Sequence, residues 1–152
     1  MSSLKEISES GDPSAFQYAF SGIGRDEYCQ VQLVADLACT TPADLKSWNE
    51  ESIFNTIKIR LRSYKTVSNA MTMARAARAI GWTVVVSADE GCAETLDTFL
   101  VDFAVGVGAH QLMPGSIECG EGVSKINRLL EIARENETIP FVGRFFRQAS
   151  SP

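Results

Sequence analysis

The chain has 152 residues and a formal net charge of −5, with 45% hydrophobic and 22% charged residues. This length favours a single domain, and the composition is that of an ordinary globular protein. The acidic balance argues against nucleic acid as a partner, because a phosphate-backbone binder needs a basic face. No apolar run reaches the ~18 residues of a membrane-spanning helix. The N-terminus lacks the pattern of a secretion signal, so we expect a cytoplasmic protein without a membrane partner.

The cysteines are widely and irregularly spaced, without a CxxC pair, at Cys29, Cys39, Cys92 and Cys119. This spacing argues against a zinc site, which needs close pairs of ligands. It favours free thiols in a reducing compartment, with two disulfides as the alternative.

Apolar strand-like runs alternate with segments of helical periodicity along the chain. In chain order, the expected elements are a vestigial strand near "LKEIS", a helix opened by Asp12-Pro13, a strand at 30–36, a short helix opened by Thr41-Pro42, a strand at 54–60, a helix at 66–80 ending before Gly81, a strand at 82–89, a helix at 94–106, a strand at 110–115 and a helix at 122–136. The periodicity of the last two helices predicts that Leu96, Phe99, Leu129 and Leu130 face the core. The alternation predicts an α/β fold of about four parallel βα units, with helices covering the sheet.

In such folds the chemistry lies beyond the carboxyl ends of the strands. The side chains expected at those ends are Asp12, Asp36, Lys58, Asp89, Glu90 and Met113. The aspartates and the lysine have structural alternatives. The aspartates can cap a helix or a turn, and a lysine inside an α/β core is unusual unless it is paired.

Several segments resemble the second half of enolase in order and spacing. They are "QLVADLACTTPADL", "TIKIR", "IGWTVVVSADEG", "ETLDTF", "GAHQLMPGS", "SKINRLLEIARE" and "FVGRFFR". The resemblance covers about residues 9–147. It implies a half barrel of the enolase-type TIM fold over 9–147, an N-terminal lead-in at 1–8 and a flexible tail at 148–152.

Enolases dehydrate 2-phosphoglycerate to phosphoenolpyruvate with two Mg²⁺ ions and a lysine base. The resemblance matches Asp36 of "VAD" to a metal-binding aspartate and Lys58 of "TIKI" to the base. The positions at which this sequence departs from the family's functional residues are Gly11, Ala88, Asp89, Glu90, Met113 and Cys119. They replace a metal glutamate, a substrate-binding His-Arg-Ser run, a second lysine and an arginine.

A substrate with a phosphate and a carboxylate needs cations around it, and these replacements remove them. The sequence therefore predicts a catalytically inactive protein, without a bound cofactor, that serves as a structural or assembly subunit. One alternative is phosphopyruvate hydratase activity, with Mg²⁺, when another chain complements this one. Another is a new metal site built from Asp36, Asp89 and Glu90.

Four parallel strands do not close a barrel, so two strand edges and an inner face need a partner. We expect other protein chains to cover this open side, in a homo- or hetero-oligomer. Degenerate enolase-like proteins occur in cilia and flagella, which makes an axoneme one candidate location. His110, the sole histidine, is either an interface residue or a structural one.

Overall fold

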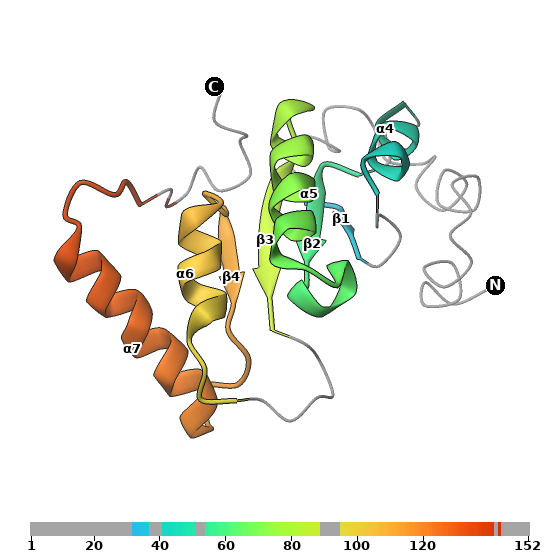
Figure 1. Cartoon of the computed structure of the whole chain (residues 1–152). Helices are drawn as coiled ribbons and strands as arrows, with labels where there is room; N and C mark the ends of the chain where they lie inside the picture. The colour runs from blue at the N-terminus through green and yellow to red at the C-terminus, as the bar shows by residue number, and fades with distance from the viewer. Residues whose placement is uncertain (1–31, 37–40, 51–53, 89–94, 142, 144–152) are drawn as a thin grey trace.

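The computed structural model describes residues 32–36, 41–50, 54–88, 95–141 and 143 (Figure 1). Its elements are β1 (Val34–Ala35), α4 (Pro42–Glu50), β2 (Thr56–Ile59), the 3₁₀ helix η1 (Leu61–Tyr64), α5 (Val67–Ala79), β3 (Thr83–Ser87), α6 (Phe99–Gly106), β4 (Gln111–Met113) and α7 (Gly120–Glu135). The segments expected before residue 32 and after residue 143, with the boundaries 1–8 and 148–152, lie outside the described residues.

The four described strands form one parallel sheet in the order β1-β2-β3-β4. Val34 pairs with Thr56, Lys58 pairs with Val85, and Ser87 pairs with Met113. Each strand is joined to the next through helical segments, as parallel strands require. The structure thus confirms the predicted α/β fold of parallel βα repeats, as a partial barrel.

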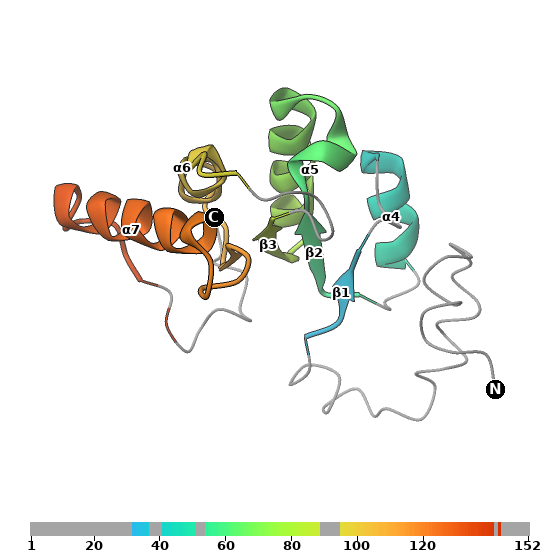
Figure 2. The same ribbon diagram turned by 90° about the horizontal axis from the view of Figure 1, so that it is seen from below.

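The helices lie on one side of this sheet, as the view along its edge shows (Figure 2). α5 packs on β2 and β3, α6 packs on β3 and β4, and α7 packs on α6. None of the described helices is long and apolar enough to cross a membrane.

Two predicted helix starts are confirmed, with their capping bonds. Thr41 precedes Pro42, and its backbone N donates to Asp44 Oδ2 at 2.8 Å while Asp44 N donates to Thr41 Oγ1 at 3.3 Å. Thr66 Oγ1 accepts a hydrogen bond from Asn69 N at the start of α5. These reciprocal bonds satisfy backbone donors that a helix leaves unpaired at its N-terminus.

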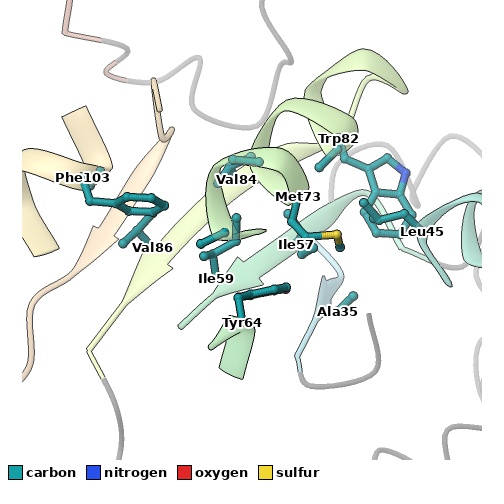
Figure 3. Close-up of a cluster of buried hydrophobic side chains, with 14 of the residues drawn as sticks. Ala35, Leu45, Ile57, Ile59, Tyr64, Met73, Trp82, Val84, Val86 and Phe103 are labelled. Carbon is teal, nitrogen blue, oxygen red and sulfur yellow. The ribbon is translucent and has the colours of Figure 1, made fainter. Parts of the chain in front are cut away.

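Alternation along the strands gives the sheet two chemically different faces. We call the helix face the one whose side chains pack under α4, α5 and α6. It carries Ala35, Ile57, Ile59, Val84, Val86 and Leu112, which pack with Leu45, Tyr64, Met73, Trp82 and Phe103 in a single core (Figure 3).

The opposite face, here called the inner face, is largely polar. It carries Thr56, Lys58, Thr83, Val85, Ser87, Gln111 and Met113. Thr56 Oγ1 and Thr83 Oγ1 share a hydrogen bond of 2.6 Å between β2 and β3. Gln32 Nε2 donates to Gln111 Oε1 at 2.9 Å, although β1 and β4 are the two edge strands. Edge strands with two others between them lie about 14 Å apart in a flat sheet, so this bond indicates an inner face that curves inward.

Two predictions of which helical residues face the core differ from the structure. α6 begins at Phe99, where Asp97 Oδ1 accepts from Phe99 N at 2.7 Å, so Leu96 precedes the helix and is 68% exposed. In α7, Leu129 and Leu130 are 36% and 49% exposed, because among the described elements this helix contacts chiefly α6 and buries only a narrow stripe.

Candidate functional site

An acidic and two basic side chains meet at the carboxyl ends of β1 and β2. Asp36 directly follows β1, Lys58 lies within β2, and Arg60 directly follows β2. Lys58 Nζ lies 3.3 Å from Asp36 Oδ2, and Arg60 Nη2 lies 2.5 Å from the same oxygen. Lys58 and Arg60 are two positions apart in extended backbone, so strand alternation places both on the inner face. The structure therefore brings Asp36 and Lys58 together, the two positions at which the sequence matches a metal acid and a base.

This cluster is shielded from water. The side chains of Lys58 and Arg60 are 9% and 15% exposed, and that of Asp36 is 33% exposed. A carboxylate bonded by two charged donors in such surroundings is held more firmly than a surface ion pair. The described part of the cluster thus joins one carboxylate to two cationic side chains.

Sequence reasoning missed Arg60. The signal for it was present in "TIKIR", because a lysine on the inner face of a strand predicts that the residue two positions later faces the same way. That Arg60 reaches Asp36 depends on the β1–β2 register, which no local pattern contains.

The described residues at the carboxyl ends of the other two strands, β3 and β4, carry no charge. Ala88 N donates to Met113 O at 2.9 Å, so the residue after β3 and the last residue of β4 lie side by side. The Met113 side chain is 48% exposed, and the neighbouring Ser87 hydroxyl donates to the Ala88 carbonyl at 2.9 Å. Gly11, Asp89 and Glu90, which the sequence also places at the site, lie outside the described residues.

The resemblance implies a divalent cation at Asp36, and the residues present can be tested against it. Among the described residues, no group of three or more His, Cys, Asp or Glu side chains converges on one point. Oδ2 of Asp36 is already engaged by two cationic side chains. A Mg²⁺ site needs several oxygen ligands in near-octahedral geometry. The described residues therefore do not by themselves fit a Mg²⁺ site, and the proposed Asp36–Asp89–Glu90 site falls partly outside them.

Cys119 lies away from this cluster, at the N-cap of α7, and its side chain is exposed. Its carbonyl accepts a hydrogen bond from Val123 N at 3.1 Å. The residue thus begins a helix.

His110 has a structural role. Its backbone N donates to Val84 O at 2.9 Å, and its Nδ1 accepts from Val84 N at 3.2 Å. Burial, and secondarily the positive charge of Arg78, lower the pKa of the imidazole. The neutral ring is therefore the form that joins β3 to the start of β4.

Acidification is expected to destabilise the protein through His110. Its pKa is lower in the folded chain than in the unfolded chain, where it is about 6.5. Neutral His110 contributes fully to the stability of the folded chain above about pH 6.5. This contribution decreases as the pH falls from about 6.5 toward the folded-state pKa, by about 1.4 kcal/mol for each pH unit between the two pKa values. Urea unfolding at about pH 8 and about pH 5 measures the effect. His110→Asn keeps an acceptor and should flatten this pH dependence, whereas an unchanged profile would contradict the prediction.

The chain matches a family model, described as the enolase C-terminal TIM barrel domain, over residues 2–150. The enolase of Malacoplasma penetrans is 34% identical over 134 residues, which are 88% of this chain and 28% of that protein. The enolase of Desulfotalea psychrophila is 40% identical over 100 residues, 66% of this chain and 23% of that protein. The enolase of Lactobacillus helveticus is 38% identical over 107 residues, 70% and 24% of the two chains. The chain therefore spans about a quarter of the length of these relatives.

The prediction that the chain is not an enzyme is wrong by this comparison, because the relatives carry the name of an enzyme and the family is enzymatic. The sequence argument took the lost groups together, at roughly 3 kcal/mol or more each, as too large a loss for a partial site to survive. Enzymes lower their barriers by about 8–23 kcal/mol in all, so a sum of several such losses does not by itself decide whether activity is lost.

The described strands and helices lie within the part of the chain that matches the enolase family model. The strands that carry Asp36 and Lys58 lie within the matched residues 2–150, as do the helices that cover the sheet. The chain belongs to the enolase family, within the part that forms the C-terminal TIM barrel domain.

Proposed function

We propose that this chain takes part in the dehydration of 2-phosphoglycerate to phosphoenolpyruvate, in a barrel that further protein completes. The observation that carries the proposal is the contact of Lys58 with Asp36, 3.3 Å apart at the carboxyl ends of two neighbouring parallel strands. That end of a barrel is where enzymes of this fold place their chemistry. The names of the relatives support the same reaction class.

The role proposed for Lys58 is that of the base. Acting as the base, its amine takes the proton from the carbon that bears the phosphate, next to the substrate carboxylate. The electron pair of that C–H bond becomes the new carbon–carbon double bond, and hydroxide leaves from the adjacent carbon as water after receiving a proton. The amine is suited to this task because it is nearly excluded from solvent and Asp36 holds it in place.

The proposed role of Arg60 toward the substrate is electrostatic. Arg60 keeps its positive charge while Lys58 acts as the base, and it lies at the same end of the sheet as Lys58. Ala88 and Met113 offer no charge at the carboxyl ends of β3 and β4. Cationic groups for the second anion of the substrate are therefore expected from elsewhere.

The partner proposed is another protein chain, either a second copy or a different one, that covers the open edges of the partial barrel. Val34 on β1 and Met113 on β4, the two edge strands, are 36% and 48% exposed on the inner face. The chain spans about a quarter of its enolase relatives, so the complete reaction needs more protein than this chain supplies. A ciliary or axonemal setting stays a prediction, since the names of the relatives do not bear on it.

The test is a dehydration assay with the native chain and whatever protein co-purifies with it, in Mg²⁺, following phosphoenolpyruvate formation. Lys58→Ala is expected to lower kcat by about 10²–10⁴-fold, the usual contribution of a general base. Lys46→Ala on the exposed surface of α4 is the matched control and should leave kcat unchanged. Turnover that is equal in the wild type and Lys58→Ala, or no turnover at all, would refute the proposal.

A further inference from the structure

Three large apolar side chains are exposed around the first turns of α7. Leu96, Ile117 and Val123 are 68%, 70% and 44% exposed, and we call them the α7-start patch. Ser124 Oγ donates to Leu96 O at 3.3 Å, and a Cβ at Gly120 would lie 4.0 Å from Leu96 Cδ2. Ile117 and Val123 lie three residues to either side of Gly120. Single exposed apolar residues are ordinary, whereas several gathered at one place indicate a surface that binds protein.

The residues around the α7-start patch are acidic. Asp97 and Glu118 directly follow two of its members and are exposed, and Glu121 lies in the first turn of α7. Between residues 95 and 127 the sequence contains a single lysine or arginine, Lys125. Its side chain is 3% exposed, and its amine donates to the carbonyls of Thr95 and Glu121 at 3.1 and 3.2 Å, so its charge is directed into the protein. The rim of the patch is therefore negative.

The opposite charge gathers beside the carboxyl end of β2. Between residues 54 and 88 the sequence contains no Asp or Glu, and its basic residues are Lys58, Arg60, Arg62, Lys65, Arg75 and Arg78. Arg62 on η1 and Lys65 directly after it are exposed. Val67 lies two residues after Lys65 and is 41% exposed. Arg62, Lys65 and Val67, here called the η1 surface, thus combine positive charge with an apolar side chain.

Both surfaces lie at the same end of the sheet. η1 and Lys65 follow β2, Leu96 lies between β3 and α6, and Ile117 follows β4. In a parallel sheet these connections all leave from the carboxyl ends of the strands, and Figure 1 shows the starts of α5 and α7 at that end. A two-fold contact is reciprocal, so a two-fold axis at this end sets the α7-start patch of each copy against the η1 surface of the other.

We propose that two copies of this chain bind each other at the carboxyl ends of their strands, with the α7-start patch of each copy on the η1 surface of the other. Asp97 and Glu118 then face Arg62 and Lys65, while the apolar side chains of both surfaces are removed from water. Salt in a cell screens exposed charges beyond about 8 Å, so these local charges outweigh the net charge of −5 on each copy. The acidic rim repels nucleic acid and anionic membranes, which leaves a second copy as the complementary surface that the structure itself supplies.

The contact uses surface residues outside the Asp36 cluster, and its test measures association instead of turnover. The contact and the proposed reaction can therefore fail separately. Sedimentation velocity of the full chain over a range of concentrations measures the association. We expect a reversible dimer whose Kd rises about tenfold between about 50 mM and about 500 mM NaCl, because salt screens exposed charges.

Two charge reversals test the contact from its two sides. Glu118→Lys and Lys65→Glu each place like charges in both contacts of a homodimer, and each should raise Kd about tenfold. Lys46→Glu on the exposed surface of α4 makes the same charge change as Lys65→Glu and should leave Kd unchanged. Leu96→Ser keeps the test informative if a reversed variant does not fold, and should weaken the dimer about fivefold at either salt concentration because it removes an apolar contact without a charge.

Mixing the two reversed proteins distinguishes this contact from any other. In a heterodimer of the Glu118→Lys and Lys65→Glu proteins, both reciprocal contacts again join opposite charges, so the mixture should associate as tightly as the wild type. A wild type that stays monomeric at low salt would overturn the proposal. So would a dimer that neither reversal weakens, or a mixture that associates no more tightly than the separate variants.

Discussion

Replacing Trp82 by alanine is expected to destabilise the protein by about 3–5 kcal/mol, the usual cost of removing a large buried aromatic ring. Trp82 is 3% exposed, and its ring contacts Phe54 with 6.3 Å between centroids. Its Nε1 donates to Asn49 Oδ1 at 3.0 Å, which ties the start of β3 to α4. A domain of this size is stable by about 5–15 kcal/mol, so the loss removes a large fraction of its stability and the variant should unfold at a distinctly lower urea concentration.

Urea unfolding followed by far-UV circular dichroism measures this change. Trp82→Phe keeps much of the ring packing while losing the indole donor, and should cost distinctly less than the alanine variant. Val67→Ala, at a position that is 41% exposed, serves as the surface control with an expected change within about 0.5 kcal/mol. A Trp82→Ala protein as stable as the Val67→Ala protein would contradict the packing described around β3.

Gly122→Ala is the second substitution with a large expected effect, and its sign is opposite to the usual one. In a helix, alanine normally stabilises relative to glycine by about 1 kcal/mol. A Cβ at residue 122, however, would lie 1.9 Å from the carbonyl oxygen of Ser116 and 2.7 Å from its carbonyl carbon. Backbone atoms cannot rotate away as a flexible side chain can, so the start of α7 or the turn before it must shift. We expect a net loss of about 1–3 kcal/mol.

Gly120→Ala in the same helix is the matched control, because the nearest atom to its Cβ is Leu96 Cδ2 at 4.0 Å, an ordinary contact. That variant should be as stable as the wild type or slightly more stable. Thermal unfolding of the two variants and the wild type under identical conditions gives the comparison. If both alanine substitutions stabilise the protein, the close approach of Gly122 to Ser116 is not present in solution.

Trp82 and Gly122 bear on function because they position elements next to the strands that carry Asp36, Lys58 and Arg60. Trp82 packs where β3 begins, beside β2, and β2 carries Lys58. Gly122 lets α7 start close to the turn that follows β4, at the same end of the sheet as Met113. A base held to within a few tenths of an ångström by its strand retains its effect, whereas a misplacement near 1 Å costs a large part of it.

The positions of the secondary structure elements were predictable from the sequence because their signals are local. Thr41-Pro42 predicted a helix start, and "TVVVS" predicted a strand buried on both faces, since neither depends on distant residues. The order of strands and helices then led to a parallel sheet with its chemistry at the carboxyl ends, where Asp36 and Lys58 lie.

What tertiary structure alone decided was which side chains touch. The sequence contained Arg60, but its contact with Asp36 depends on the pairing of β1 with β2. The exposure of Leu129 and Leu130 followed from the packing of α7 chiefly on α6 among the described elements, which helical periodicity does not contain. Local patterns record the backbone preference of a segment and its apolar side, whereas the distance between residues on separate strands depends on register and sheet curvature. These are properties of the assembled sheet.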